Sequence, residues 1–371
     1  MAGPEIPKTM KAVQVIEYKN PYEIRTVPVP TDLKPTDLLV KVAVASNCHT
    51  DSMVQQGVFG GPLPQTASHE GSGTVVAVGS DTEAAKLGFQ VGTRVMVGIP
   101  LGPCGTCGDC RGPEGQTQYC TQVEGMVGVH IDGCFAEYVR ADARTSTPLP
   151  DTVSFLSAAP LACAGRTVWR AVLQAELKKG QWVAVVGSGG GLGHLGLQFA
   201  KARGLRVIGI DAREEGLELT RKHGADVVVD ARKGKEEAVK EVQAVTGGEG
   251  AYATINLSDA PTAAALACAV TRMHGTMVQI AQPDEISVPF PEIIFRDIRI
   301  KGSLICSNEE SKGMMQAIAE HGVTAKTVPF QGLDKIFDLV DMVHSGKVSG
   351  KAVIIVDGKQ IEEEKKLGAR F

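Results

Sequence analysis

Four cysteines lie within seventeen positions of the stretch GPCGTCGDCRGPEGQTQYC. Two residues separate Cys104, Cys107 and Cys110 from one another in turn, and Cys120 follows after nine more. Thiolates this close can surround one tetrahedral Zn²⁺ at about 2.3 Å each, and four protein ligands leave no position for a substrate. Disulfide-bonded, redox-active or palmitoylated cysteines are the alternatives, but the spacing favours a structural zinc site.

A second set of metal-binding residue types is dispersed along the chain. Cys48 lies in NCHTD, His69 in SHEGSG and Cys163 in PLACAG. Taken singly, Cys163 has the context of a small buried hydrophobic residue and His69 that of a hydrogen-bonded histidine, because no local spacing joins them. A zinc held by two cysteines and a histidine, with an open fourth position, is nevertheless an established catalytic arrangement. The three residues are therefore candidate ligands.

The run VVGSGGGLGHLG, residues 185–196, is typical of a turn that binds a dinucleotide. Glycines let the backbone approach a pyrophosphate, which the free N–H groups of the next helix then bind. The candidate contacts are Gly187, Gly190, Gly191, Leu192 and Gly193. Asp211 follows 18 residues after Gly193, where a carboxylate can bind the ribose hydroxyls and repel a 2′-phosphate. We therefore expect NAD rather than NADP, although Arg213 argues the other way; a turn without a ligand is the alternative.

The segments that must position these residues change character near residue 160. Up to about residue 158, short alternating runs such as DLLVKVAV predict a β-rich domain. Six β-like runs follow, and helical stretches separate most of them, which predicts a doubly wound parallel sheet. The runs are 182–187, 206–211, 225–230, 251–257, 275–281 and 299–305. Two helices are expected at 192–204, ending at Gly204, and at 259–275, capped by Asp259 and stopped by Gly275.

Composition narrows the classes of partner. The net charge is −4 and no basic patch is visible, which argues against nucleic acid. No apolar run approaches the roughly 20 residues that span a bilayer, and the first residues lack the apolar segment of a secretory signal. We therefore expect no membrane partner and a cytoplasmic location, where reducing conditions favour metal binding by the nine cysteines over disulfides.

The motifs become most informative in combination. NCHTD, SHEGSGTVVAVG, GPCGTCGDC, DGCFAEYV, PLACAG, GSGGGLG and VSGKAVIIVD occur in order over nearly the whole chain. With this set the chain resembles the zinc-dependent alcohol dehydrogenases of the medium-chain dehydrogenase/reductase family, and its glycine turn is most similar to that of the yeast-like, homotetrameric branch. The resemblance implies an α/β fold with a β-rich GroES-like catalytic domain (1–163 and 302–371) and a doubly wound Rossmann domain (164–301) that has a six-stranded parallel sheet and binds NAD.

The resemblance also assigns roles to single residues and implies two Zn²⁺ ions per subunit. The structural zinc would be held by Cys104, Cys107, Cys110 and Cys120, and the catalytic zinc by Cys48, His69 and Cys163. Glu70 can approach the catalytic metal, and Asp51 orients the His69 ring. Thr50 meets the substrate oxygen and passes its proton onward, and His49 contacts the cofactor phosphate. Helix caps, for Asp51 and Thr50, and a surface imidazole, for His49, are the alternatives.

Three features depart from the family pattern. Met53 stands where the proton relay usually ends in a histidine, so we expect the proton to leave through water or His49. The only tryptophans are Trp169 and Trp182, neither of which narrows the substrate loop, whose main bulk is Phe59. The gap of nine residues before Cys120 exceeds the usual seven, but closing a slightly longer loop costs little. The remaining thiols, Cys134, Cys268 and Cys306, have the contexts of core residues.

The expected activity is reversible hydride transfer between NAD(H) and a primary or secondary alcohol or its aldehyde or ketone. The wider substrate loop favours medium-chain, branched or aromatic substrates over ethanol. One alternative is a biosynthetic reductase of the same fold that acts on a specialised carbonyl metabolite. A non-catalytic dinucleotide-binding protein is another, and the presence of all three candidate catalytic ligands argues against it.

Overall fold

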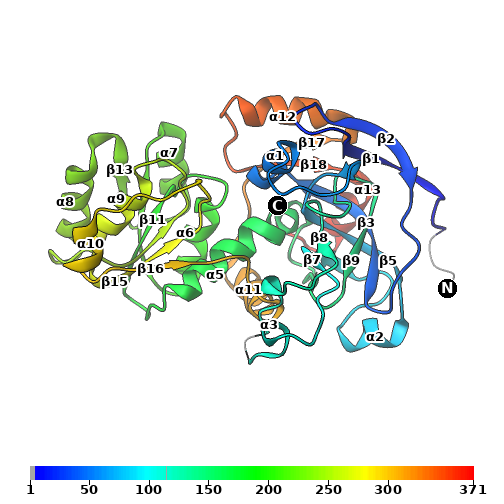
Figure 1. The fold of residues 1–371 in the computed structure, drawn as a ribbon, viewed down its shortest axis with the longest axis horizontal. Helices are drawn as coiled ribbons and strands as arrows, with labels where there is room; N and C mark the ends of the chain where they lie inside the picture. Colours follow the sequence, from blue (N-terminus) through cyan, green and yellow to red (C-terminus); the bar gives the residue numbers. More distant parts are fainter. Residues whose placement is uncertain (1–4, 114) are drawn as a thin grey trace. The chain divides into compact units, whose positions relative to one another are not determined.

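The computed structural model describes residues 5–113 and 115–371. The chain divides into two compact units. One unit holds the chain up to Cys163 together with Cys306–Phe371, and the other holds Ala164–Ile305, the green-to-yellow part of the ribbon in Figure 1.

The first unit is built around a mixed sheet to which the described residues contribute seven strands. Its order is β10-β6-β5-β3-β18-β17, and β9 also pairs with β3. Only β17 and β18 run parallel to each other. The strands are β3 (Asp37–Ser46), β5 (Glu70–Val78), β6 (Arg94–Met96), β9 (Tyr138–Asp142), β10 (Thr147–Pro148), β17 (Thr327–Gln331) and β18 (Lys351–Ile355).

Strand β3 is the central element of this sheet, and it is apolar on both faces. Leu38 and Val40 belong to one core cluster, whereas Leu39 belongs to a second. A strand covered on both faces can therefore be nearly continuously hydrophobic, as the sequence DLLVKVAVAS is. At its end, Ser46 pairs with Glu70 of β5 on one side and with Val353 of β18 on the other. The residues that follow Ser46 thus emerge between the starts of two neighbouring strands.

Two smaller sheets and a set of helices complete the first unit. Strand β1 (Thr9–Val15) pairs with β2 (Glu23–Pro28) and β4 (Gln65–Thr66), and β7 (Pro100–Leu101) pairs with β8 (Gly125–Met126). The helices are α1 (His49–Gln55), α2 (Asp81–Lys86), α3 (Gly108–Arg111), α4 (Phe155–Pro160), α11 (Asn308–His321), α12 (Ile336–His344) and α13 (Gly358–Lys366). Two 3-10 turns, η1 (Thr117–Tyr119) and η4 (Leu333–Lys335), also belong to this unit.

The second unit contains the predicted six-stranded parallel sheet, in the order β13-β12-β11-β14-β15-β16. This order reverses direction beside β11, as in doubly wound dinucleotide-binding folds. Its strands are β11 (Trp182–Val186), β12 (Arg206–Asp211), β13 (Val227–Asp230), β14 (Ala251–Asn256), β15 (Thr271–Gln279) and β16 (Arg299–Gly302). Its helices are α5 (Arg166–Gln174), α6 (Gly193–Ala202), α7 (Glu214–Lys222), α8 (Lys235–Val245), α9 (Ala263–Val270) and α10 (Phe290–Ile294), with the 3-10 turn η3 (Ala231–Lys233).

The two helices expected in this unit differ in how well their limits agree with the structure. Gly204 follows α6 with φ +71°, a left-handed conformation that suits glycine, and confirms the predicted helix end. The helix expected over 259–275 is only α9, so both predicted limits were wrong. The Thr271 hydroxyl donates to the Ala267 carbonyl at 2.7 Å, and the backbone of Thr271 then pairs with β14. Sheet pairing therefore takes the segment after Val270 out of the helix.

No helix in residues 5–113 and 115–371 is both long and apolar enough to cross a membrane.

The two tryptophans are core residues of the second unit: Trp169 packs edge-on against Phe199 at 5.3 Å between ring centroids, and Trp182 lies beneath the Arg206 guanidinium. Neither indole belongs to the first unit, where the candidate metal ligands lie.

Candidate metal centres and cofactor site

The turn from β3 into α1 positions Cys48. Cys48 is the N-cap of α1, in an extended conformation with φ −126° and ψ 161°. The buried Asp51 carboxylate accepts the backbone N–H of Cys48 at 2.7 Å and that of Ser68 at 3.2 Å. A carboxylate at the third helical position is the usual partner in such a capping box. Asp51 thus ties the start of α1 to the segment that carries His69.

His69 is held by a tight turn just before β5. Ser68 adopts φ +73°, an uncommon conformation for a residue with a side chain. Its hydroxyl donates to the Ser46 carbonyl at 2.9 Å, and a Cβ at Gly133 would lie 2.2 Å from the Ser68 carbonyl oxygen. Only glycine fits at position 133 without a shift of the backbone. These contacts fix Ser68 and, with it, the direction of His69.

Four ligand atoms from three separate segments meet at this end of the sheet. Cys48, His69, Glu70 and Cys163 each offer one atom, and these atoms all lie within 4.8 Å of one another. Cys163 comes from a π-helical turn, η2 (Leu161–Gly165), which follows α4. Two sulfurs, an imidazole and a nearby carboxylate are the donor types that bind zinc. The structure therefore brings together the dispersed residues singled out in the sequence.

The burial of the His69 ring and the lack of hydrogen bonds to its nitrogens are independent evidence that this side chain is a metal ligand. The side chain is 3% exposed, and neither ring nitrogen has a hydrogen-bond partner among the residues that the structure describes. Nδ1 points to Asp51, with Oδ1 at 3.5 Å, which leaves Nε2 for a metal. A buried imidazole without hydrogen bonds is costly unless another partner satisfies it, and a zinc ion would do so.

The ionisable groups of this cluster strongly shift one another's pKa values. The contact with the Cys163 sulfur lowers the pKa of the Cys48 thiol well below its ordinary value, with Lys351 and His69 acting in the same direction. Burial opposes charge on His69, but the Asp51 carboxylate outweighs it and the pKa is raised well above its usual range. Burial also raises the pKa of Glu70 to about 7, against the opposite effect of Lys351. Such mutual shifts are typical of functional sites.

The other residues expected around this centre lie on α1. Thr50 Oγ1 is 3.9 Å from Cys48 Sγ, so the hydroxyl lies beside the first candidate ligand. His49 is exposed at the start of the helix, and Met53 is half-buried one turn further along. Phe59, expected to supply the bulk of the substrate loop, is 39% exposed.

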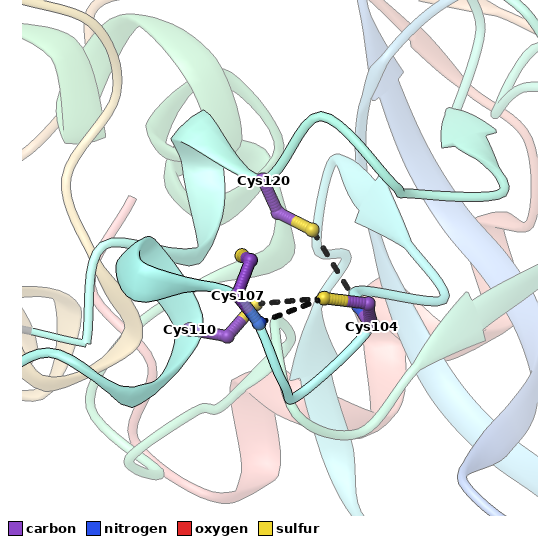
Figure 2. A group of neighbouring side chains, drawn as sticks. All are labelled: Cys104, Cys107, Cys110 and Cys120. Carbon is purple, nitrogen blue, oxygen red and sulfur yellow. Dashed lines mark hydrogen bonds between the residues drawn. The ribbon is translucent and has the colours of Figure 1, made fainter.

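The four clustered cysteines form a second compact group, shown in Figure 2. Their sulfurs all lie within 4.8 Å of one another, and the Sγ atoms of Cys104 and Cys110 are 3.9 Å apart. Two sulfurs bound to one tetrahedral zinc at about 2.3 Å each would be about 3.8 Å apart. The nine-residue gap before Cys120 therefore does not prevent the four sulfurs from meeting.

Hydrogen bonds prepare Cys104 to act as a thiolate. The Thr106 hydroxyl and backbone N–H both lie 3.4 Å from its sulfur, and the Cys107 N–H donates at 3.3 Å (Figure 2 shows the latter). These donors, the Thr106 hydroxyl first, lower the pKa of Cys104 to about 5. All nine cysteines lie in the described part of the chain and none of them is in a disulfide; Cys134, Cys268 and Cys306 are buried. The arrangement fits a structural metal site with four sulfur ligands.

The glycine turn of the second unit opens into a pocket of about 820 Å³. Gly187 turns the chain with φ +79°, and Gly190 lines the pocket beside the Arg213 side chain. Gly191 and Leu192 complete the turn into α6, and a Cβ at Gly193 would lie 2.2 Å from the Gly187 carbonyl oxygen. A crevice beyond the carboxyl ends of parallel strands, at the point where their order reverses, is where such folds bind ligands.

Asp211 lies at the end of β12 and lines this pocket. Its carboxylate accepts the backbone N–H groups of Gly189 at 2.9 Å, Ala212 at 2.9 Å and Arg213 at 3.0 Å. The Arg213 side chain, 51% exposed, lies 3.4 Å from the same carboxylate. Asp211 and Arg213 thus lie side by side at the rim of the pocket. These are the two residues from which the sequence predicted opposing effects on the choice between NAD and NADP.

Sequence reasoning missed two residues of these sites. Gly189 was left out of the glycine contacts, yet its N–H holds Asp211 and a Cβ there would lie 2.0 Å from the Gly216 carbonyl oxygen. Lys351 was quoted within VSGKAVIIVD but given no role. It is buried, and its Nζ lies 2.7 Å from Glu70 Oε2. A lysine that opens an otherwise apolar buried strand was the available signal.

Comparison with known proteins covers both units. Residues 34–151 match the family described as "Alcohol dehydrogenase GroES-like domain", and residues 191–320 match "Zinc-binding dehydrogenase". Over 351 residues the chain is 33% identical to an alcohol dehydrogenase of Geobacillus stearothermophilus, covering 94% of this chain and 100% of the relative. An alcohol dehydrogenase of Rhizobium meliloti (strain 1021) is 34% identical over 356 residues, with 94% and 100% covered.

The fold agrees with these matches. The alcohol dehydrogenase of the archaeon Aeropyrum pernix superimposes with a TM-score of 0.83 at 32% identity, covering 93% of this chain and 99% of that one. The predicted combination of a GroES-like part and a six-stranded Rossmann sheet is thereby confirmed. The two family matches together span more than half of the chain, and relatives at 33–34% identity are covered almost completely. The chain therefore belongs to the zinc-binding alcohol dehydrogenase family.

Proposed function

We propose that this chain is a zinc-dependent alcohol dehydrogenase and carbonyl reductase that prefers NAD(H). Its substrates are primary or secondary alcohols, and the corresponding aldehydes or ketones, of medium length, with branches or with an aromatic ring. The observation that carries the proposal is the meeting of Cys48, His69 and Cys163, far apart in the chain, within one buried cluster. A second zinc held by the four clustered cysteines would be structural. In this proposal residues 164–301 bind NAD, and residues 1–163 and 302–371 hold both metals.

Different side chains of the first unit have different roles in the proposed reaction. A zinc held by Cys48, His69 and Cys163 would supply Lewis acidity, and a bound nicotinamide cofactor would supply the capacity for hydride transfer. Asp51 orients the His69 ring, and the Thr50 hydroxyl, 3.9 Å from Cys48 Sγ, relays the proton that the alcohol gives up. Met53 has no titratable group, so this proton passes to water or to the exposed His49. One hydride and one proton leave the alcohol in each turnover.

The family membership supports enzymatic action, and the intact ligand set argues against a non-catalytic relative. The finer alternative, a biosynthetic reductase of a specialised carbonyl metabolite, differs only in substrate. The homotetramer, the yeast-like branch and the cytoplasmic location stay predictions. Sedimentation of the purified chain at several concentrations would test the tetramer directly.

A substrate series with measured metal content tests the proposal. We expect protein containing about two zinc ions per chain to reduce NAD with alcohols. We expect kcat/KM to rise by roughly tenfold or more from ethanol to a medium-chain or aromatic alcohol, because each additional buried CH₂ contributes about 0.8 kcal/mol and roughly two of them suffice for a tenfold change. Neither tryptophan belongs to the unit that holds the metal cluster, and Phe59 is partly exposed, so the substrate loop offers little bulk. Highest kcat/KM for ethanol would contradict the substrate class, and zinc-loaded protein without any alcohol or carbonyl activity would contradict the function.

Cofactor choice gives a second test at Asp211. We expect kcat/KM for NADH to exceed that for NADPH by roughly 10- to 100-fold, because a 2′-phosphate beside the carboxylate is repelled. Asp211→Ser should reduce this ratio at least tenfold, since Arg213 then faces the phosphate without a competing acid. Arg213→Ala is the matched variant and should increase the ratio. A ratio that stays constant in both variants, measured by steady-state kinetics with each cofactor, would rule out control by this pair.

A further inference from the structure

Lys351 and Glu70 form an ion pair shielded from water in the first unit. The two side chains are 5% and 0% exposed, and Nζ lies 2.7 Å from Oε2. Two buried charges are retained only where each compensates the other, because an uncompensated buried charge is strongly destabilising. Most other ion pairs among the described residues, such as Lys41 with Asp357, leave at least one partner substantially exposed. This pair is therefore unusual in its depth.

The pairing of β18 with β3 places Lys351 beside the candidate metal ligands. Glu70 opens β5, and its backbone pairs with Ser46 at the end of β3. On the other side of β3, Val353 pairs with the same Ser46, and the Asn47 N–H donates to the Ala352 carbonyl at 2.9 Å. Lys351 precedes Ala352, just as Cys48 follows Asn47. The first residue of β18 is thus placed at the same end of the sheet as the candidate ligands.

Glu70 is close enough to be a metal ligand itself. Its carboxylate belongs to the group of four whose ligand atoms lie within 4.8 Å of one another. Carboxylate oxygens bind zinc at about 2.0–2.2 Å, so a small movement would complete a four-coordinate site from protein atoms alone. A site closed in this way has no position for an alcohol, as in structural zinc sites. Something must hold the carboxylate back if the centre is to act on a substrate.

Charge balance identifies Lys351 as that restraint. Two thiolates and a neutral imidazole cancel the charge of one Zn²⁺, so Glu70 adds a negative charge that the metal site does not need. The Lys351 ammonium, 2.7 Å away, supplies the compensating positive charge. In a buried environment a carboxylate without that partner is drawn to the nearest cation, because charge interactions there are weakly screened.

We propose that Lys351 is a positioning residue that keeps the Glu70 carboxylate in an ion pair and thereby keeps the fourth metal position open for substrate. The inference rests on the proposed function, because it concerns the same metal centre. A lysine that merely stabilised the fold would contribute to stability without altering the coordination of the metal.

The test uses the full chain with Co²⁺ in place of zinc at the catalytic centre, because the visible absorption of Co²⁺ reports its ligands. The variants are Lys351→Met, Lys351→Arg and the double variant Lys351→Met/Glu70→Gln. The probe is imidazole, which competes for the fourth position. Lys41→Met, in an ion pair on the same sheet but outside the cluster, is the control for loss of a lysine.

We expect Lys351→Met to change the Co²⁺ spectrum and to weaken imidazole binding roughly tenfold or more, as Glu70 occupies the fourth position. KM for alcohol should rise by a similar factor. Lys351→Arg, the double variant and Lys41→Met should retain the spectrum and imidazole affinity of the unaltered chain, since each either keeps the cation, removes the competing carboxylate or leaves the pair intact.

Two results would overturn the inference. One is a folded Lys351→Met protein with an unaltered Co²⁺ spectrum and unaltered imidazole affinity. The other is a Lys351→Met protein that fails to fold or to bind Co²⁺ while the double variant fails equally, because the lysine would then serve stability alone. Either result leaves the proposed function standing. An unaltered chain whose Co²⁺ spectrum does not respond to imidazole and which oxidises no alcohol would instead refute the proposed function.

Discussion

Replacing Cys163 with alanine is expected to lower alcohol oxidation by roughly 10³-fold, because Lewis-acid stabilisation worth several kcal/mol is lost with the metal and each 1.4 kcal/mol changes the rate tenfold. Cys163 shares a coordinating-distance cluster with Cys48 and His69. Without its sulfur, one of three protein anchors is missing and the bound zinc should fall by about one ion per chain. The measurements are metal content and NADH formation on the same preparation.

Cys134→Ala provides the matched control for this variant. Cys134 is a fully buried thiol of the first unit, whereas Cys163 is partly buried, and Cys134 lies outside both groups of metal-binding side chains. Burial raises the pKa of its thiol, which makes it a poor thiolate. Its removal should leave zinc content unchanged and reduce turnover less than about threefold, through packing alone. Equal loss of zinc or activity in the two variants would show that the cluster does not bind the catalytic metal.

The second large effect concerns stability. Cys104→Ala is expected to lower Tm by about 10 °C, because structural zinc contributes several kcal/mol to folding and about 1 kcal/mol moves Tm by roughly 2–4 °C in a unit of this size. From Cys104 to Cys120, the described part of the loop buries only Gln118 and Cys120, so it has almost no apolar core of its own. We therefore expect the conformation of this loop to depend on the four sulfurs and on a zinc ion bound by them.

Hydrogen bonds at the start of the loop that carries Cys104 should confine the effect of Cys104→Ala to that loop. The Arg144 side chain donates to the Pro103 carbonyl at 2.8 Å and to Asp142 at 2.6 Å, so the entry to the loop is fixed independently of the cysteines. Metal analysis of Cys104→Ala should show one zinc ion fewer with the catalytic ion retained. Cys268→Ala, in the core of the second unit, is the comparison and should lower Tm by only a few degrees with full zinc content. Full zinc content and normal Tm in Cys104→Ala would exclude a structural metal there.

The extent of prediction from sequence differs between the two groups of candidate ligands. The spacing of Cys104, Cys107 and Cys110 limits how far apart their sulfurs can lie, so a metal site could be inferred locally. Nothing in the sequence near Cys48, His69 or Cys163 indicates that they meet. That inference depended on the resemblance to a family, and the structure supplies the physical cause in the pairing of Ser46 with both Glu70 and Val353.

The same contrast appears in the second unit. The alternation of β-like runs and helical stretches predicted the parallel sheet, and a glycine after the helical stretch predicted the end of α6 at Gly204, because both depend on local patterns. The limits of α9 were wrong because pairing of Thr271 with β14 competes with helix formation and cannot be seen from the segment alone. The burial of the Asp211 carboxylate against the Gly189 N–H likewise depends on a loop and a strand end that are distant in sequence.

The sequence by itself determined the alternation of elements, the glycine turn and the clustered cysteines, because each follows from spacing over a few residues. Only the tertiary structure decided that Cys48, His69 and Cys163 converge, and that the Lys351 ammonium lies 2.7 Å from Glu70. The physical reason is that hydrogen bonding between strands far apart in the chain sets which side chains share one end of a sheet. Side-chain type alone carries no information about that register.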